Sequence, residues 1–174
     1  MARKRIFIPF APARSYPRGA ADFVEGGELF LTAPDAGALE RAQAALGGAA
    51  DIIGGSLTKD MSLAEIAPAV IECAEKLGGI DMILFMPDIG SREPLFLDIS
   101  PDDFTAHTAA LNGFFMACKC ALPYMMGGES PVIAALLPAE PANIAESMYR
   151  AAMESIIDGM KAEFESYGIT ATAV

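Results

Sequence analysis

Short apolar runs alternate along the whole chain with segments of helical periodicity. Six runs have the length and composition of strands buried in a sheet. Between them, apolar residues recur every three or four positions, which predicts helices. We expect strands at 3–10, 27–32, 49–54, 80–86, 131–137 and 169–174, and helices at 20–25, 35–46, 63–77, 101–125 and 144–167. This alternation predicts an α/β fold, with a doubly wound and mainly parallel sheet of about six strands.

The last two predicted helices are apolar on two sides. In each, one side carries small residues and another carries larger ones, and little of the circumference is left to polar residues. A surface helix of a monomeric domain needs only one apolar stripe. We therefore expect the small side of 144–167 to lie on the sheet and the larger sides to contact a second subunit. The residues expected at that contact are Phe104, Leu111, Phe115, Tyr149, Met153, Ile156, Met160 and Phe164.

Composition agrees with a buried contact between subunits and excludes several classes of function. The 174 residues are 53% apolar, and the mean hydropathy of +0.36 is high for a monomer. We expect one domain over residues 1–174, because no linker or repeat interrupts the pattern. A net charge of -11 argues against binding nucleic acid or anionic membranes. No apolar run has the length of a membrane span, and the start of the chain lacks a signal-peptide core, so a cytoplasmic protein is expected.

The few residues that commonly bind metals or act as nucleophiles lie in apolar surroundings. Cys73, Cys118 and Cys120 fall within predicted helices and are expected to be free thiols in a reducing compartment. The only histidine, His107, is expected to be a packed or capping residue. Three cysteines and one histidine make no recognisable ligand set, so no metal site is expected.

Three segments, GGIDMILFM, ALNGFFMACKCALPYMM and KAEFESYGITATAV, resemble the short-chain dehydrogenase/reductase superfamily. The resemblance extends over the order of elements in the whole chain. It implies a Rossmann-like sheet, NAD(P) binding, and oxidation of alcohols or reduction of ketones. It also implies a catalytic tyrosine assisted by a lysine four residues later, a serine and an asparagine. Members continue into a substrate-covering segment and a seventh strand, so this sequence is expected to stop before that strand.

The segment after the first predicted strand lacks the glycine-rich turn that the resemblance would require. It reads PFAPARSYPRG, and the first glycine of the chain is Gly19. A pyrophosphate in such a turn is held by backbone N–H groups, and Pro9, Pro12 and Pro17 have none. We therefore expect this chain to bind no dinucleotide. Asp35, which could be read as a ribose ligand, is expected to cap a helix instead.

The positions that correspond to the superfamily's catalytic residues hold other residue types. The tyrosine and lysine positions are occupied by Glu146 and Arg150, and the asparagine position by Ala110. The serine position falls near Ala135 and Leu136. No catalytic residue of the family's kind is therefore expected. Glu146 and Arg150 stand four residues apart, which predicts an ion pair on the helix surface.

These observations support two hypotheses from different classes. The preferred one is a non-catalytic subunit, a pseudoenzyme, of a hetero-oligomeric and tetrameric alcohol or hydroxyacyl-CoA dehydrogenase of the short-chain type. Such a subunit would stabilise or complete an active partner that binds NAD, and it would be similar in kind to the non-catalytic subunit of the heteromeric 2-[hydroxy(phenyl)methyl]succinyl-CoA dehydrogenase. The alternative is a nucleotide-independent enzyme, a lyase or an enzyme resembling halohydrin dehalogenases, that uses Arg150 with Glu146 or Tyr149. A homo-oligomeric binding protein is a third option.

Overall fold

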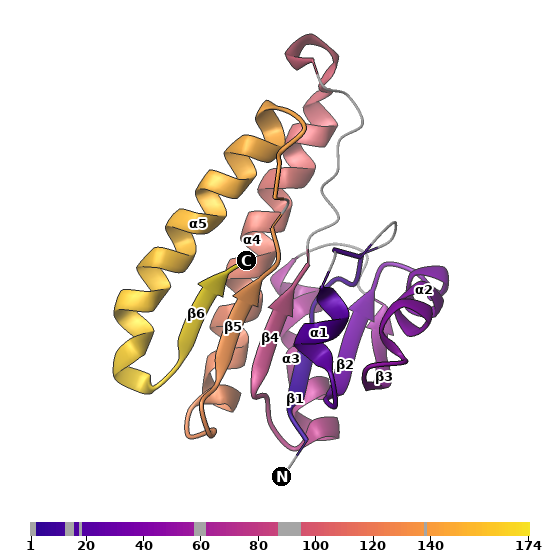
Figure 1. Cartoon of the computed structure of the whole chain (residues 1–174), viewed down its shortest axis with the longest axis vertical. Coiled ribbons are helices and arrows are strands. Elements are labelled where there is room, and N and C mark those ends of the chain that lie inside the picture. The colour runs from indigo at the N-terminus through magenta and orange to yellow at the C-terminus, as the bar shows by residue number, and fades with distance from the viewer. Residues whose placement is uncertain (1–2, 13–15, 18, 58–61, 87–94, 138) are drawn as a thin grey trace.

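The computed structural model describes residues 3–12, 16–17, 19–57, 62–86, 95–137 and 139–174. They contain a six-stranded sheet in which every strand runs parallel to its neighbours, in the order β3-β2-β1-β4-β5-β6 (Figure 1). The predicted doubly wound α/β fold is confirmed. The strands are β1 (Arg5–Ile8), β2 (Glu28–Ala33), β3 (Asp51–Leu57), β4 (Met82–Phe85), β5 (Val132–Ala135) and β6 (Thr170–Ala173).

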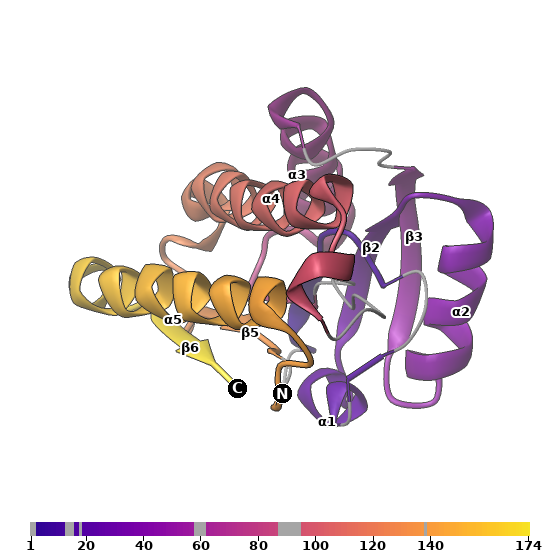
Figure 2. The same cartoon turned by 90° about the horizontal axis from the view of Figure 1, so that it is seen from above.

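Helices cover both faces of the sheet (Figure 2). The three longest lie on one face, and two shorter ones lie on the other. The helices are α1 (Ala20–Val24), α2 (Ala36–Leu46), α3 (Leu63–Leu77), α4 (Pro101–Met125) and α5 (Ile144–Phe164), with 3-10 turns η1 (Phe96–Asp98) and η2 (Glu165–Tyr167). The turn η1 was not predicted, because a single turn has no periodicity to read.

The central strands are apolar on both faces of the sheet because each face is buried in a separate hydrophobic core. Phe7, Ile83 and Phe85 point into the core under α3, α4 and α5. Ile6 and Leu84, from the same strands, point into the core under α1 and α2. This explains why these strands appear in the sequence as continuous apolar runs rather than as alternating ones.

The two long helices turn different kinds of residue toward the sheet. On α4 the buried side is mostly small and includes Ala110, Ala117 and Ala121. On α5 the buried side is large, and the residues expected to lie on the sheet are exposed instead. The buried residues of α5 include Tyr149, Met153, Ile157, Met160 and Phe164, and its exposed residues include Ala151, Ser155, Gly159 and Ala162.

The predicted orientation of α5 is therefore wrong, and the reason is side-chain volume. The strands nearest α5 are rich in alanine on that face, with Ala135 and Ala171 buried in the same core as the helix. Small strand residues leave room that only large helix residues fill at the density of a protein interior.

The observed orientation of α5 also corrects part of the predicted subunit contact. Tyr149, Met153, Met160 and Phe164 are buried within the chain, Leu111 and Ile156 are half-buried, and only Phe104 and Phe115 are exposed.

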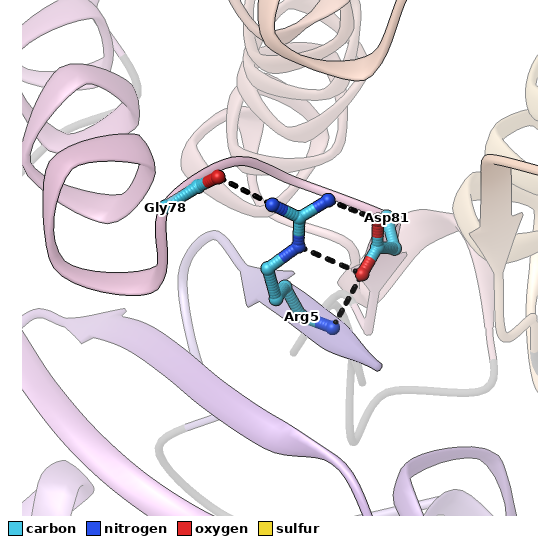
Figure 3. A network of polar contacts seen from close by, with 3 residues as sticks. All are labelled: Arg5, Gly78 and Asp81. Carbon is cyan, nitrogen blue, oxygen red and sulfur yellow. Dashed lines mark hydrogen bonds and ion pairs between the residues drawn. The ribbon is translucent and has the colours of Figure 1, made fainter. Parts of the chain in front are cut away.

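An ion pair ties the amino ends of β1 and β4 together (Figure 3). Arg5 Nε donates to Asp81 Oδ2 at 2.9 Å, and Arg5 Nη2 donates to Asp81 Oδ1 at 2.6 Å. The backbone N–H of Arg5 also donates to Asp81 Oδ2 at 2.9 Å. Arg5 Nη1 donates to the carbonyl oxygen of Gly78, at the end of α3. The hydrogen bond from Arg5 lowers the pKa of the Asp81 carboxyl below its ordinary value.

We predict that Asp81→Asn lowers the free energy of unfolding by about 2 kcal/mol at neutral pH, because the half-buried Arg5 loses its charged acceptor. A lowered folded-state pKa stabilises the protein above the unfolded-state pKa, about 3.9, and this stabilisation is lost as the pH falls through the folded-state value. The difference between the two proteins should therefore shrink below about pH 4. Urea unfolding at several pH values measures it. Asp158→Asn, which removes an exposed pair with Lys161, is the control. A difference that stays constant with pH would contradict the assignment.

Candidate functional site

The turn after β1 lies at the carboxyl edge of the sheet, where ligands bind in doubly wound folds. Its first backbone N–H groups are already occupied. Phe10 N–H donates to Thr32 Oγ1 at 3.2 Å, and Ala11 N–H donates to the carbonyl oxygen of Thr32 at 2.7 Å. Phe10 has a left-handed backbone, with φ of 58°, and its ring is buried in the core under α3 and α4. The turn is therefore held against β2 by Thr32 and filled by an aromatic side chain.

These features do not fit a bound pyrophosphate. The donors of Phe10 and Ala11 face β2, and Pro9 and Pro12 beside them have no N–H. The helix that follows, α1, has only five residues and begins after Gly19. A phosphate site of the dinucleotide type needs free N–H groups and the positive end of a longer helix.

Asp35 lies at the carboxyl end of β2, where a ribose ligand would stand in a dinucleotide-binding fold. Its Oδ1 accepts a hydrogen bond from the backbone N–H of Ala38 at 2.8 Å, which caps α2. Arg41 Nη2 lies 3.8 Å from the same oxygen. The predicted role of Asp35 as a helix cap is confirmed.

Glu146, at the position predicted to correspond to the family's tyrosine, bonds to two residues at the start of α5. Asn143 Oδ1 accepts from the backbone N–H of Glu146 at 3.0 Å, and Glu146 Oε2 accepts from the backbone N–H of Ala142 at 2.7 Å. Glu146 is only 5% exposed, so its predicted place on the helix surface is wrong. The signal was present in the sequence, since Asn143 and Glu146 have the spacing of a capping box, a pattern normally written with serine or threonine at the first position.

Arg150, at the position of the family's lysine, connects α5 to the segment before it. Its Nη1 donates to the carbonyl oxygen of Ala139 at 2.6 Å. Its Nε donates to Glu154 Oε1 at 2.9 Å, an ion pair between residues four apart on the same helix. These contacts hold the guanidinium in place at the carboxyl edge of the sheet.

Tyr149 lies inside the molecule, one residue before Arg150. Its exposed fraction is 0%, and its hydroxyl has no hydrogen-bond partner among the described residues. Burial raises the pKa of this hydroxyl far above its ordinary value, so the group stays protonated. The ring meets the edge of the His107 ring, with 6.1 Å between ring centroids. His107 is 2% exposed, which confirms its prediction as a packed residue.

The remaining predicted positions contribute only apolar surface. Ala110, Ala135 and Leu136 are all buried, and they lie on α4 and at the end of β5. The positions predicted to correspond to the catalytic residues thus lie on α4, on α5 and at the end of β5. No group of three metal-binding side chains occurs in the described part of the chain.

A separate cavity lies beyond that edge, on the outer side of the long helices. Its volume is about 840 Å³, within the range of small-molecule sites. The lining is mostly apolar, and the hydroxyl of Thr105 already donates to the carbonyl oxygen of Pro101 at 2.8 Å. The sequence did not predict this cavity, because one wall is the turn η1. The lining residues are Phe96, Leu97, Ile99, Ser100, Pro101, Phe104, Thr105, Ile144 and Met148.

Within the described residues, no helix is both long and apolar enough to cross a membrane.

No protein-family model matches the sequence, and no curated protein matches it. Solved structures do match. A short chain oxidoreductase from Pseudomonas aeruginosa, described as containing an atypical catalytic center, is 16% identical with a TM-score of 0.78, over 97% of this chain and 68% of that one.

Two further structures match to a similar degree. A 3-ketoacyl-(acyl-carrier-protein) reductase from Brucella melitensis, complexed with NADH, is 15% identical with a TM-score of 0.78, over 98% of this chain and 74% of that one. Levodione reductase is 17% identical with a TM-score of 0.80, over 99% of this chain and 71% of its own length. At these identities the similarity is one of architecture, and the chain has the Rossmann-like fold of the short-chain dehydrogenases/reductases.

Proposed function

We propose that this chain is a non-catalytic subunit of a hetero-oligomeric, short-chain type alcohol or hydroxyacyl-CoA dehydrogenase. One observation carries the proposal: the polar groups at the carboxyl edge of the sheet are used to hold the chain together. Thr32 accepts from the turn after β1, Glu146 accepts from the backbone N–H of Ala142, and Arg150 donates to Ala139 and Glu154. The other catalytic positions, Ala110, Ala135 and Leu136, are apolar.

In such a complex the active subunit supplies NAD and the proton-transferring residues. This chain supplies a folded surface that stabilises or completes the partner. We expect a heterotetramer that contains two copies of this chain and two copies of the active subunit. The apolar residues that remain exposed on α4, such as Phe104 and Phe115, support a role in assembly.

The alternative, a nucleotide-independent enzyme, requires Arg150 to act with Glu146 or Tyr149 on a bound substrate. Tyr149 is fully buried, and its raised pKa makes it a poor base. A carboxylate oxygen of Glu146 accepts from the backbone N–H of Ala142. Neither observation favours catalysis.

The proposal is tested by co-expression with an intact short-chain dehydrogenase encoded in an adjacent reading frame. We expect the two chains to co-purify as one complex with NAD-dependent activity. We expect the isolated chain to show no heat of NADH binding in titration calorimetry, because the N–H groups of Phe10 and Ala11 already donate to Thr32 and Pro9 and Pro12 have none.

Micromolar NADH binding by the isolated chain would overturn the assignment of the turn. A stable homodimer that does not associate with the dehydrogenase would favour the homo-oligomeric binding protein instead.

We predict that Tyr149→Phe leaves the activity of the complex unchanged and raises the free energy of unfolding by up to about 1 kcal/mol. The reason is that a buried hydroxyl without a partner costs desolvation energy that the folded state does not recover. Urea unfolding and steady-state kinetics measure the two effects. Tyr124→Phe, at an exposed position, is the matched control. A tenfold loss of activity in Tyr149→Phe alone would support the enzyme alternative.

A further inference from the structure

The strand β6 forms one edge of the sheet, and no described strand lies on its outer side. Thr170 N–H donates to the carbonyl oxygen of Pro131 at 2.9 Å, so this residue faces β5. Because the backbone groups of successive strand residues point to opposite sides, Ala171 and Ala173 direct their N–H and C=O groups away from the sheet. Thr172 Oγ1 donates to the carbonyl oxygen of Ala173 at 3.5 Å, which leaves that oxygen a second lone pair.

The side chains of this edge do not oppose the addition of another strand. Residues 169–174 read ITATAV, with no charge and no proline, and their register with β5 is regular. Native sheets usually protect an exposed edge with a lysine, a proline or a bulge. The opposite edge strand, β3, begins with the charged Asp51 and contains Gly54 and Gly55, which weaken strand pairing. Of the two edges, β6 is therefore the one suited to strand addition.

A hollow lies beside the start of this edge, between the end of α5 and β6. Its volume is about 440 Å³, enough for a side chain of an added strand. One basic and one acidic side chain stand in its walls, so the hollow suits an uncharged side chain. The lining residues are Lys161, Glu165, Gly168, Ile169, Thr170 and Ala171.

A second copy of this chain does not suit the edge. Helix α5 covers β6 (Figure 2), with Phe164 and Ala171 buried in the same core. Two copies joined edge to edge would therefore bring their α5 helices together. The exposed charges of this helix are mostly acidic, so the two helices would repel each other. They are Glu154, Asp158 and Glu163 against Lys161.

We propose that β6 pairs with an extended segment of the active dehydrogenase subunit, which adds a strand to this sheet. The backbone of that segment exchanges hydrogen bonds with Ala171 and Ala173, and one of its uncharged side chains enters the 440 Å³ hollow. In strand addition, main-chain hydrogen bonds supply the affinity and side-chain pockets supply the specificity. This inference rests on the proposed function and specifies how the two chains join.

The first test is Ala173→Pro, which removes one outward N–H group from the edge. Proline is tolerated where the N–H of an edge strand faces solvent, so the midpoint of urea unfolding should change little. Binding to the dehydrogenase, measured by calorimetry on the purified chains, should weaken at least tenfold. The matched control is Ala173→Ser, which keeps the N–H group and should bind within twofold of the parent chain.

The second test follows the edge directly, by hydrogen exchange of individual amides measured by NMR. In the isolated chain the amides of Ala171 and Ala173 should exchange fast, and the amide of Thr170, which donates to Pro131, should exchange slowly. In the complex the amides of Ala171 and Ala173 should slow at least 100-fold.

A complex that forms and is unaffected by Ala173→Pro would overturn the strand pairing while leaving the proposed function intact. A chain that binds no dehydrogenase would overturn both. Slow exchange at Ala171 and Ala173 in the isolated monomer would show an edge already covered and would also overturn the pairing. Protection that appears only as the concentration of the isolated chain rises would make a second copy the occupant.

Discussion

The packing of side chains between the sheet and helices α4 and α5 decides which residues of these two helices are buried and which are exposed. Alanines of β5 and β6 leave space that Tyr149 and Met153 of α5 fill. Filling that space turns the small residues of α5 outward. On α4, Phe114 packs against Phe85 of β4 with 5.1 Å between ring centroids, and Ala110, Ala117 and Ala121 are buried in the same core. Burying this side of α4 leaves Phe104 and Phe115 exposed.

At the carboxyl edge of the sheet, several polar groups bond to other parts of the same chain. The groups that would hold a pyrophosphate or move a proton are backbone donors and polar side chains. Here the N–H groups of Phe10 and Ala11 bond to Thr32, and Glu146 bonds to Ala142. A donor or acceptor used inside the chain is not available to a ligand. The described contacts at this edge therefore connect the turn after β1 to β2 and connect α5 to the residues before it.

Shared architecture with reductases does not by itself transfer their chemistry. At 15% to 17% identity, the matched structures share the arrangement of strands and helices with this chain. Function depends on the groups at particular positions, and folds of this type serve many functions. The contacts of Glu146, Tyr149 and Arg150 are therefore better evidence about this protein than its overall similarity.

The sequence by itself determined the order of strands and helices and the parallel sheet, because apolar periodicity and two-sided apolar runs are local properties of the chain. It also showed the absence of a glycine turn and the caps at Asp35. Only the tertiary structure decided which side of α5 is buried, that Glu146 is inside, and that Arg150 also donates to Ala139. Periodicity shows that a helix has two apolar sides. The choice between them depends on the volumes of residues far away in the sequence, which meet the helix only when the chain folds.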